Sequence, residues 1–307
     1  MGTGTGYERG LSDKKWKMLI GHIKRGDCTP FIGSGACKTL PKGGELAELL
    51  AKDSCYPLDD KYDLQKVSQF IAIDDDVKTL RHGVIDILKS RPYPDFNSPL
   101  EPHSLLADLD LPIYITTNYD DFMYQALKRR ERDVKTDFTR WANEVKDEKI
   151  KSILFDEEYK PTPEQPLVYH LHGNCDVPES MVLTEEDYLD FLINVSKDKD
   201  IIPPAITTAL SSTALLFIGY SLNDSTLRFI VRGLMRTMTT KNQCRSIAVQ
   251  IEPDLKSKNN EDMLTACDYL DKYFDVHFNI NIDVYWGKAE NFVAELRGHW
   301  DKYSKEA

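Results

Sequence analysis

Polar residues follow an apolar segment at 113–115 in greater variety than a simple loop requires. Thr116, Thr117, Asn118, Asp120 and Asp121 supply two hydroxyls, one amide and two carboxylates before a helical pattern begins at residue 122. One capping residue, Asp120 or Asp121, is enough to start a helix, so the reading of a plain helix cap stays open. Ligands of open α/β sheets bind at the carboxyl ends of strands, and the surplus groups here favour such a site.

Three further apolar segments end in glycine or small polar residues. Residues 28–32 lead into G-S-G at 33–35, residues 166–171 lead into His172-Gly173, and residues 214–218 lead into G-Y-S-L-N-D at 219–224. The G-S-G turn lacks the third glycine of the dinucleotide fingerprint, so a phosphate loop and a tight turn both remain open. Because parallel strands end at one edge of a sheet, the four segments predict a common cleft.

Strand and helix patterns alternate along most of the chain, which predicts a doubly wound, Rossmann-like parallel α/β sheet in a single domain over residues 1–307. Residues 45–98 carry helical stripes and no strand pattern, so we expect a mostly helical insertion there. Charges at 128–133 indicate a solvated excursion through 128–165. Predicted helices cover 12–25, 122–128, 184–192, 224–234 and a last segment bearing Phe292, Val293, Leu296 and Trp300; the predicted strands after residue 165 are 166–172, 214–218, 247–251 and 280–285.

Composition excludes several classes of protein. The net charge of −11 argues against direct nucleic-acid binding. No apolar run approaches the ~18 residues that a membrane span needs. The N-terminal residues lack the apolar core of a signal peptide, and the six cysteines form no C-x-x-C pair, so we expect no zinc. Scattered cysteines without export signals favour a cytoplasmic location.

In their order, the four polar segments resemble the motifs of the sirtuin family, and most closely its prokaryotic sirtuin-like branch. That family carries a G-A-G-x-S loop, T-x-N-x-D, H-G and G-x-S, which correspond here to residues 33–37, 116–120, 172–173 and 219–221. The resemblance spans roughly residues 28–290. Ser34 and Cys37 replace the usual alanine and serine, and both zinc pairs of the classical deacetylases are missing.

This resemblance implies a NAD+ glycohydrolase of bacterial antiphage defence, which cleaves the nicotinamide–ribose bond to give nicotinamide and ADP-ribose. Asn118 would orient water or a ribose hydroxyl. His172 would be the general base because histidine titrates near neutrality, with His170 as the competing base. The expected NAD-binding residues are Gly33, Ser34, Gly35, Ala36, Cys37, Thr117, Asp120, Gly219 and Ser221. Within this set, backbone amides of 33–37 would face the pyrophosphate, and Asp120 would accept from the nicotinamide carboxamide.

Two other functions remain open: a non-catalytic sensor of NAD or ADP-ribose, and a NAD-dependent protein deacylase. The missing zinc cysteines count against deacylation, and the presence of both Asn118 and His172 counts against a pure sensor. A nuclease would need a metal-ligand cluster, which the sequence lacks. A freely active NAD hydrolase would harm its own cell. We therefore expect a homo-oligomer or a complex with a DNA-translocating ATPase, an Argonaute-like protein or a repeat-type sensor.

Overall fold

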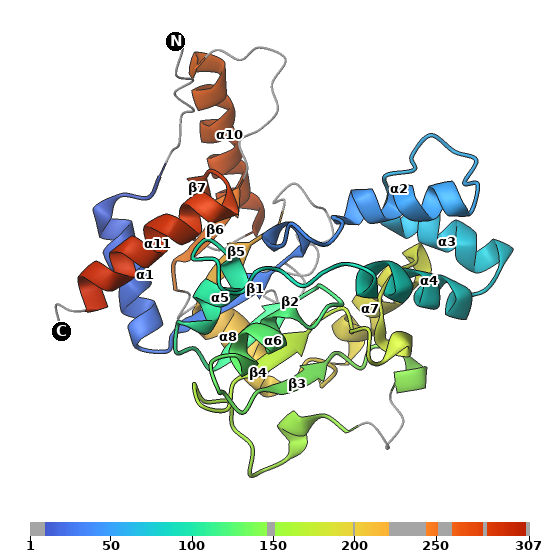
Figure 1. Cartoon of the computed structure of the whole chain (residues 1–307), viewed down its shortest axis with the longest axis horizontal. Helices are drawn as coiled ribbons and strands as arrows, with labels where there is room; N and C mark the ends of the chain where they lie inside the picture. The colour runs from blue at the N-terminus through green and yellow to red at the C-terminus, as the bar shows by residue number, and fades with distance from the viewer. Residues whose placement is uncertain are drawn as a thin grey trace.

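The computed structural model describes residues 10–145, 151–198, 200–220, 244–250, 260–278 and 281–304. Seven parallel strands form one sheet in the order β3-β4-β2-β1-β5-β6-β7 (Figure 1). The strands are β1 (Cys28–Ile32), β2 (Ile113–Thr116), β3 (Lys135–Phe138), β4 (Leu167–His170), β5 (Ala214–Ile218), β6 (Ser246–Gln250) and β7 (Ile282–Trp286). The sheet confirms the predicted parallel α/β fold.

The central strand β1 is the point at which the chain reverses its direction across the sheet. From β1 the chain builds β2, β3 and β4 on one side, and it then returns to place β5, β6 and β7 on the other. β1 pairs with both β2 and β5, with Ile32 opposite Thr116 and Ile218. In open α/β sheets the crevice at such a switch point is the usual place for a ligand.

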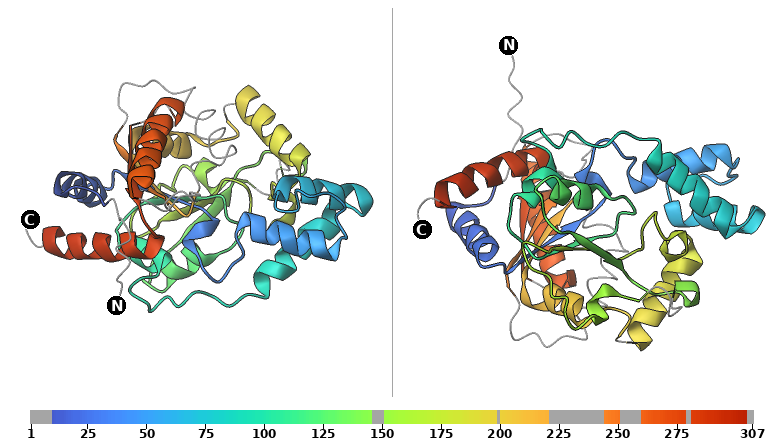
Figure 2. Two further views of the ribbon diagram at one scale, coloured as in Figure 1. Left: turned by 90° about the horizontal axis from the view of Figure 1, so that it is seen from above. Right: turned by 60° about the horizontal axis from the view of Figure 1, so that its bottom comes forward.

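Helices cover both faces of the sheet, and each face has its own hydrophobic core (Figures 1 and 2). One face packs against α1 (Asp13–Lys24), α5 (Pro102–Ala107), α6 (Phe122–Lys128) and α11 (Ala289–Ser304). The other packs against α7 (Glu185–Lys197), α8 (Pro204–Ser212) and α10 (Asn260–Phe278). Strands buried on both faces read as continuous apolar runs, which is why 214–218 was recognisable from sequence. None of the helices in the described ranges is long and apolar enough to cross a membrane.

The predicted helical insertion is a cluster of three helices beside the sheet (Figure 2). α2 (Gly43–Asp53), α3 (Leu64–Asp74) and α4 (Val77–Lys89) contain all of its regular structure, and residues 45–98 form no strand. The buried side chains of this cluster include Leu46, Val67 and Val84, which pack with Met181 and Leu183 from the segment before α7. The insertion therefore has a third core, separate from the two that flank the sheet.

Amphipathic stripes and caps formed largely as the sequence predicts. Trp16 and Ile20 of α1 are buried, and so are Phe292 and Leu296 of α11. Thr184 accepts a hydrogen bond from the Asp187 amide, and the Asp187 carboxylate accepts from the Thr184 amide, so the T-E-E-D sequence at 184–187 forms a capping box at the start of α7. Each helix stripe thus follows the 3.6-residue period that orients it toward the sheet.

The prediction of a solvated excursion at 128–165 was wrong for residues 135–138. These residues form the edge strand β3, which pairs with β4. Its sequence, K-T-D-F, has no apolar alternation, and its buried Asp137 accepts from Arg140 and Ser152 instead of facing solvent. The predicted helix at 224–234 lies outside the described residues.

The strand that precedes His172 is shorter than predicted. β4 ends at His170, so His172 lies in the following turn rather than on the strand. Gly173 has a φ of +79°, a left-handed conformation that redirects the chain. In a strand that ran through residue 172, Val168, His170 and His172 would share one face. The His172 ring instead contacts Tyr188 and Phe191 of α7, on the opposite face of the sheet from Val168.

Candidate active site

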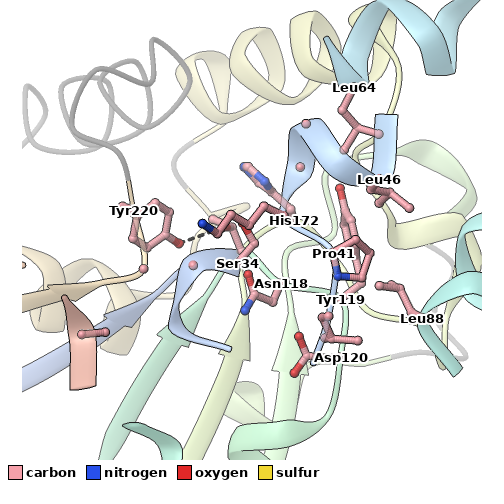
Figure 3. Close-up of a pocket in the computed structure, with 18 of the residues that line it drawn as sticks. Ser34, Pro41, Leu46, Leu64, Leu88, Asn118, Tyr119, Asp120, His172 and Tyr220 are labelled. Atoms are coloured by element: carbon pink, nitrogen blue, oxygen red, sulfur yellow. Dashed lines mark hydrogen bonds between the residues drawn. The ribbon is translucent and has the colours of Figure 1, made fainter. Parts of the chain in front are cut away.

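A cavity of about 510 Å³ lies between the carboxyl ends of the strands and the helical insertion (Figure 3). Its walls come from the segments after β1, β2, β4, β5 and β7, the carboxyl end of β6, and the insertion helices. Figure 3 shows Pro41, Leu46, Leu64 and Leu88 grouped on one side of the cavity. Ser34, Asn118 and Tyr220 lie on the other side. The insertion side of the cavity therefore carries most of its apolar side chains, with Lys42 as a charged exception, and polar side chains lie toward the sheet.

Most of the predicted site residues converge on this cavity. Those that line it are Ser34, Gly35, Thr117, Asn118, Asp120, His172 and Gly219. Gly33, Ala36 and Cys37 are not among the lining residues; the Cys37 sulfur instead accepts from the amide of Thr39. Ser221 lies outside the described residues. His170 lines a second cavity of about 520 Å³ on the other side of Asp120.

His172 is the most unusual polar residue of the cavity. It is 3% exposed, and its ring packs edge-on against Tyr188 and Phe191 with centroid distances of 5.3 Å. Its Nε2 atom is buried and has no hydrogen-bond partner in the part of the chain that the structure describes. Burial lowers the pKa of His172 to about 3, so the expectation of titration near neutrality was wrong. The imidazole is neutral at pH 7.

Asn118 presents its side chain to the cavity while its backbone is held from both sides. The Asn118 amide donates to Thr116 Oγ1 at 2.9 Å, and its carbonyl accepts from His170 Nδ1 at 3.0 Å. No hydrogen bond to the Asn118 side chain occurs within the described ranges, which leaves its donor and acceptor free for a ligand. His170 thus supports Asn118 from behind, and burial lowers the pKa of His170.

Tyr220 ties the end of β5 to the end of β2. Its hydroxyl lies 2.9 Å from the Ile32 carbonyl, to which it donates, and 2.7 Å from Thr117 Oγ1. The tyrosine proton is used on Ile32, so Thr117 is the donor in the second bond. The Ile32 carbonyl also accepts from Thr116 Oγ1 at 3.0 Å. This network fixes the polar wall of the cavity at the switch point of the sheet.

Asp120 lies between the two cavities and lines both of them. One of its carboxylate oxygens accepts from the Phe122 amide at 3.0 Å. Asp121 holds the N-cap position of α6, but its side chain makes no capping hydrogen bond. Burial raises the pKa of this carboxyl, while nearby His103 and His170 oppose the shift.

The glycines of the first and fourth motifs pack against each other. A Cβ atom on Gly219 would lie 2.2 Å from the Ala36 amide nitrogen, and one on Gly33 would lie 2.7 Å from the Gly219 carbonyl. The Gly35 amide donates to that carbonyl at 2.9 Å. Close backbone packing between the two loops therefore accounts for these glycines, which is the tight-turn interpretation that the sequence left open.

Several residues of the cavity were not identified from the sequence. They are Leu40, Pro41, Lys42, Gly43, Gly44, Leu46, Leu64, Leu88, Tyr119, Tyr188, Tyr220, Val249, Gln250, Gly287 and Ala289. The K-G-G run at 42–44 could have been noticed in the sequence, because two glycines at the start of an amphipathic helix disfavour helix formation and so indicate another role. The leucines looked like ordinary core positions, and only the fold shows that they face the sheet. Within the described ranges, no group of three or more His, Cys, Asp or Glu residues could hold a metal ion.

Comparison with protein families identifies the class of this fold and site. The family model described as "SIR2-like domain" matches residues 112–274, more than half of the chain. The chain therefore belongs to the SIR2-like domain family. The match begins just before β2 and includes the segments of Asn118 and His172.

Similar curated proteins carry the name NAD(+) hydrolase ThsA. The protein from Acinetobacter baumannii (strain 532279) is 25% identical over 218 residues, which are 69% of this chain and 40% of that relative. The protein from Bacillus cereus (strain MSX-D12) is 28% identical over 131 residues, 43% of this chain and 24% of the relative. The chain thus spans less than half the length of these relatives.

A solved structure titled "Structural Basis for the Mechanism and Regulation of Sir2 Enzymes" covers 95% of this chain and 100% of its own. Its TM-score is 0.43 and the sequence identity is 11%.

Proposed function

We propose that this chain is a NAD+ glycohydrolase that cleaves the nicotinamide–ribose bond to give nicotinamide and ADP-ribose. The observation that carries the proposal is the meeting of Asn118 and His172 at one cavity. They follow different strands, and each presents polar atoms that no described residue satisfies. The name of the relatives, NAD(+) hydrolase, supports the same reaction.

The chemistry of the reaction suits a neutral, buried histidine. As the N-glycosidic bond breaks, nicotinamide leaves with the bonding electrons as a neutral ring, and positive charge develops on the ribose. Asn118 orients a water molecule toward the anomeric carbon. The oxygen of that water bonds to the carbon, and its proton passes to the His172 imidazole and then to solvent. Water that attacks a cationic sugar becomes strongly acidic, so a base with a low pKa suffices.

Two ends of the sheet side of the cavity would hold the two halves of the substrate. Asp120 stands at the end of the cavity nearest Asn118, where its oxygen can accept from the carboxamide of nicotinamide. Gly219, Tyr220 and Gln250 form the opposite side, which is suited to the adenosine half. We propose these two assignments for the substrate and place the protein in antiphage defence as a NAD-depleting effector.

A test of the catalytic pair uses nicotinamide release from NAD by purified variants. His172→Ala should lower turnover by about 10²–10⁴-fold, the usual range for loss of a general base. Asn118→Ala should also inactivate, since the water loses its orientation. His170→Ala should lower turnover less, because the His170 ring donates to the Asn118 backbone carbonyl and is not among the residues that line this cavity.

Circular dichroism of each variant serves as the folding control, and an acylated peptide added to the same assay tests deacylation. Near-normal turnover in folded His172→Ala would exclude it as the base. Nicotinamide release that requires the acylated peptide would favour the deacylase. Binding of NAD with no release under either condition would favour the sensor.

A further inference from the structure

A buried acid–histidine pair lies at the start of α5. Glu101 is 8% exposed and His103 is 1% exposed, and neither residue lines the two cavities described above. The His103 Nδ1 atom donates to one Glu101 oxygen at 2.7 Å, and the Ser104 amide donates to the other. Burial alone would raise the pKa of Glu101, but these hydrogen bonds and the nearby imidazole hold it below its usual range. Glu101 is therefore a buried carboxylate.

The negative charge of Glu101 needs a partner, and His103 is placed to supply it. A carboxylate is stable in a protein interior when it is paired with a cation. In the described part of the chain no lysine or arginine forms an ion pair with Glu101, so the imidazole is its partner. Since Nδ1 already donates to Glu101, a proton on Nε2 completes an imidazolium. The pair is thus arranged to hold a buried positive charge.

His103 packs against the residue that holds Asp120 in place. The His103 ring lies edge-on to the Phe122 ring, with a centroid distance of 6.1 Å, and the Phe122 amide donates to one Asp120 oxygen. No described residue donates to the other Asp120 oxygen, which leaves it for a ligand at the cavity wall. Burial raises the pKa of Asp120, and a charge on His103 opposes that shift. The pair is therefore close enough to influence Asp120.

Two cations across the second cavity are not bonded to Asp120. Lys89 and Arg91 line that cavity, and neither forms an ion pair with Asp120 in the described ranges. Both residues are exposed, so water and salt screen their charges. They are poor substitutes for a buried imidazolium.

The other titratable groups around Asp120 do not supply a positive charge either. Asp121 carries a negative charge, and its carboxylate accepts from the Tyr93 hydroxyl. Burial raises the pKa of Cys175 to about 12 and that of Tyr93 above its usual value, so both are neutral at pH 7. Burial lowers the pKa of His170, which favours its neutral form. Of the described groups that face Asp120, His103 is the one that a buried carboxylate keeps charged.

The charge of Asp120 decides which chemical group the cavity accepts at this end. An ionised carboxylate only accepts hydrogen bonds, so it binds the N–H donors of a carboxamide and repels another carboxylate. A neutral carboxyl group has an O–H donor, so it can also bind a carboxylate. Nicotinamide and nicotinic acid differ in this one group. A positive charge beside Asp120 therefore favours the carboxamide over the carboxylate.

We infer that Glu101 and His103 set the preference of the site for a carboxamide by holding Asp120 in its ionised form. Glu101 keeps the second proton on His103, and His103 acts through Asp120 without contacting the substrate. Both are therefore positioning residues. The inference rests on the proposed function for the assignment of Asp120 to the nicotinamide carboxamide, and it adds the two residues that make this assignment selective.

The first test compares the binding of NAD with that of its analogue, nicotinic acid adenine dinucleotide, which has a carboxylate in place of the carboxamide. Calorimetry uses chains that carry Asn118→Ala, so that neither dinucleotide is consumed. His103→Gln retains a donor for Glu101 but cannot carry a charge. It should lower the preference for NAD at least about 10-fold, the scale of one charged hydrogen bond. Glu101→Gln should act in the same direction, and the double variant should lose little more, because the two residues act as a unit.

Ser104→Ala is the matched control for a disturbance of α5. Ser104 is buried next to His103, and its hydroxyl donates to the Phe96 carbonyl at 2.7 Å, but it carries no charge. The variant should leave the ratio of the two affinities unchanged, even where it weakens both. A purely structural role of His103 would likewise lower both affinities together, so the ratio isolates the effect of its charge.

A second measurement follows Asp120 directly in the unliganded chain. The carboxyl carbon resonance of Asp120, assigned with Asp120→Asn, reports its ionisation as the pH is varied. In His103→Gln this resonance should titrate at a higher pH than in the unaltered chain, because the positive charge that opposes the effect of burial is gone. In Ser104→Ala its midpoint should stay the same.

An unchanged preference for NAD in His103→Gln would overturn the inference, as would an unchanged titration of Asp120 in that variant. A failure of the Asn118→Ala chain to bind NAD would also overturn it. A preference that depends on His103, in a chain that cleaves no NAD when Asn118 is intact, would sustain the inference and refute the hydrolase. NAD cleavage combined with a preference that His103→Gln leaves intact would do the reverse.

Discussion

The environment of His172 sets both its chemistry and its effect on stability. Burial against Tyr188 and Phe191 holds the pKa at about 3, whereas an unfolded histidine titrates near 6.5. Below pH 6.5 the unfolded chain takes up a proton at this position and the folded chain does not. The free energy of unfolding therefore falls as the pH drops from 6.5 toward 3, and the contribution of His172 is constant above that window.

We expect this residue alone to lower the free energy of unfolding by roughly 2 kcal/mol between pH 7 and pH 5, since one pKa unit corresponds to about 1.4 kcal/mol. Urea unfolding of the unaltered protein and of His172→Gln at the two pH values measures the effect. The variant has no titrating group there, so its loss of stability on acidification should be smaller by that amount. Equal pH dependence in the two proteins would contradict the burial of an uncharged His172.

At the scale of elements, the loops after β1 and β5 form one unit through their glycines. Gly219 has a φ of +81° and no room for a Cβ, while Gly26, which ends α1, has a φ of +71° and nothing within 4 Å of its Cβ position. The two glycines share a left-handed backbone conformation but differ in the space around the Cβ position, so their alanine variants form a matched pair.

Gly26→Ala should cost about 1–2 kcal/mol, the strain of a left-handed alanine. Gly219→Ala should cost at least about 2 kcal/mol more, because its Cβ meets backbone atoms that cannot move aside. Thermal unfolding of the two variants gives the comparison. A similar loss in both would mean that the loops at 33–37 and 219–220 are not packed as described.

The sequence predicted elements well where a strand or helix was long and apolar, and poorly where packing decided the outcome. Buried strands such as β5 and the stripes of α1 and α11 follow directly from their apolar periods. The edge strand β3 was missed because buried polar bonds of Asp137 replace apolar alternation. The glycines at 33 and 35 matched a ligand motif, yet the contact that requires them is with Gly219, nearly two hundred residues away in the chain.

The candidate site was likewise only partly predictable from the sequence. Asn118, Asp120 and His172 were identifiable because polar groups at strand ends have few structural uses. The lowered pKa of His172 could not be predicted, because it depends on burial against two rings from α7. The cavity residues of the insertion, such as Lys42, could not be predicted either, because the sequence alone does not show that the insertion packs over the sheet.

At the scale of the whole molecule, we expect the proposed activity to be restrained until it is needed. The cavity is already formed in the isolated chain, and a NAD hydrolase without restraint would deplete its own cell. We predict a homo-oligomer or a complex with a partner protein as the means of that restraint. Light scattering combined with the nicotinamide assay tests this. A monomer that is fully active without additions would contradict it.

The helical insertion has its own packed core, and this has a consequence for how the site can diversify. One wall of the cavity belongs to the sheet and carries the residues to which we assign the reaction, while the other belongs to α2, α3 and α4. Substitutions at Leu46, Leu64 or Leu88 can reshape the second wall without touching the strands that hold Asn118 and Asp120. Specificity for the bound molecule could therefore change during evolution through the insertion, while the residues to which we assign the reaction stay the same.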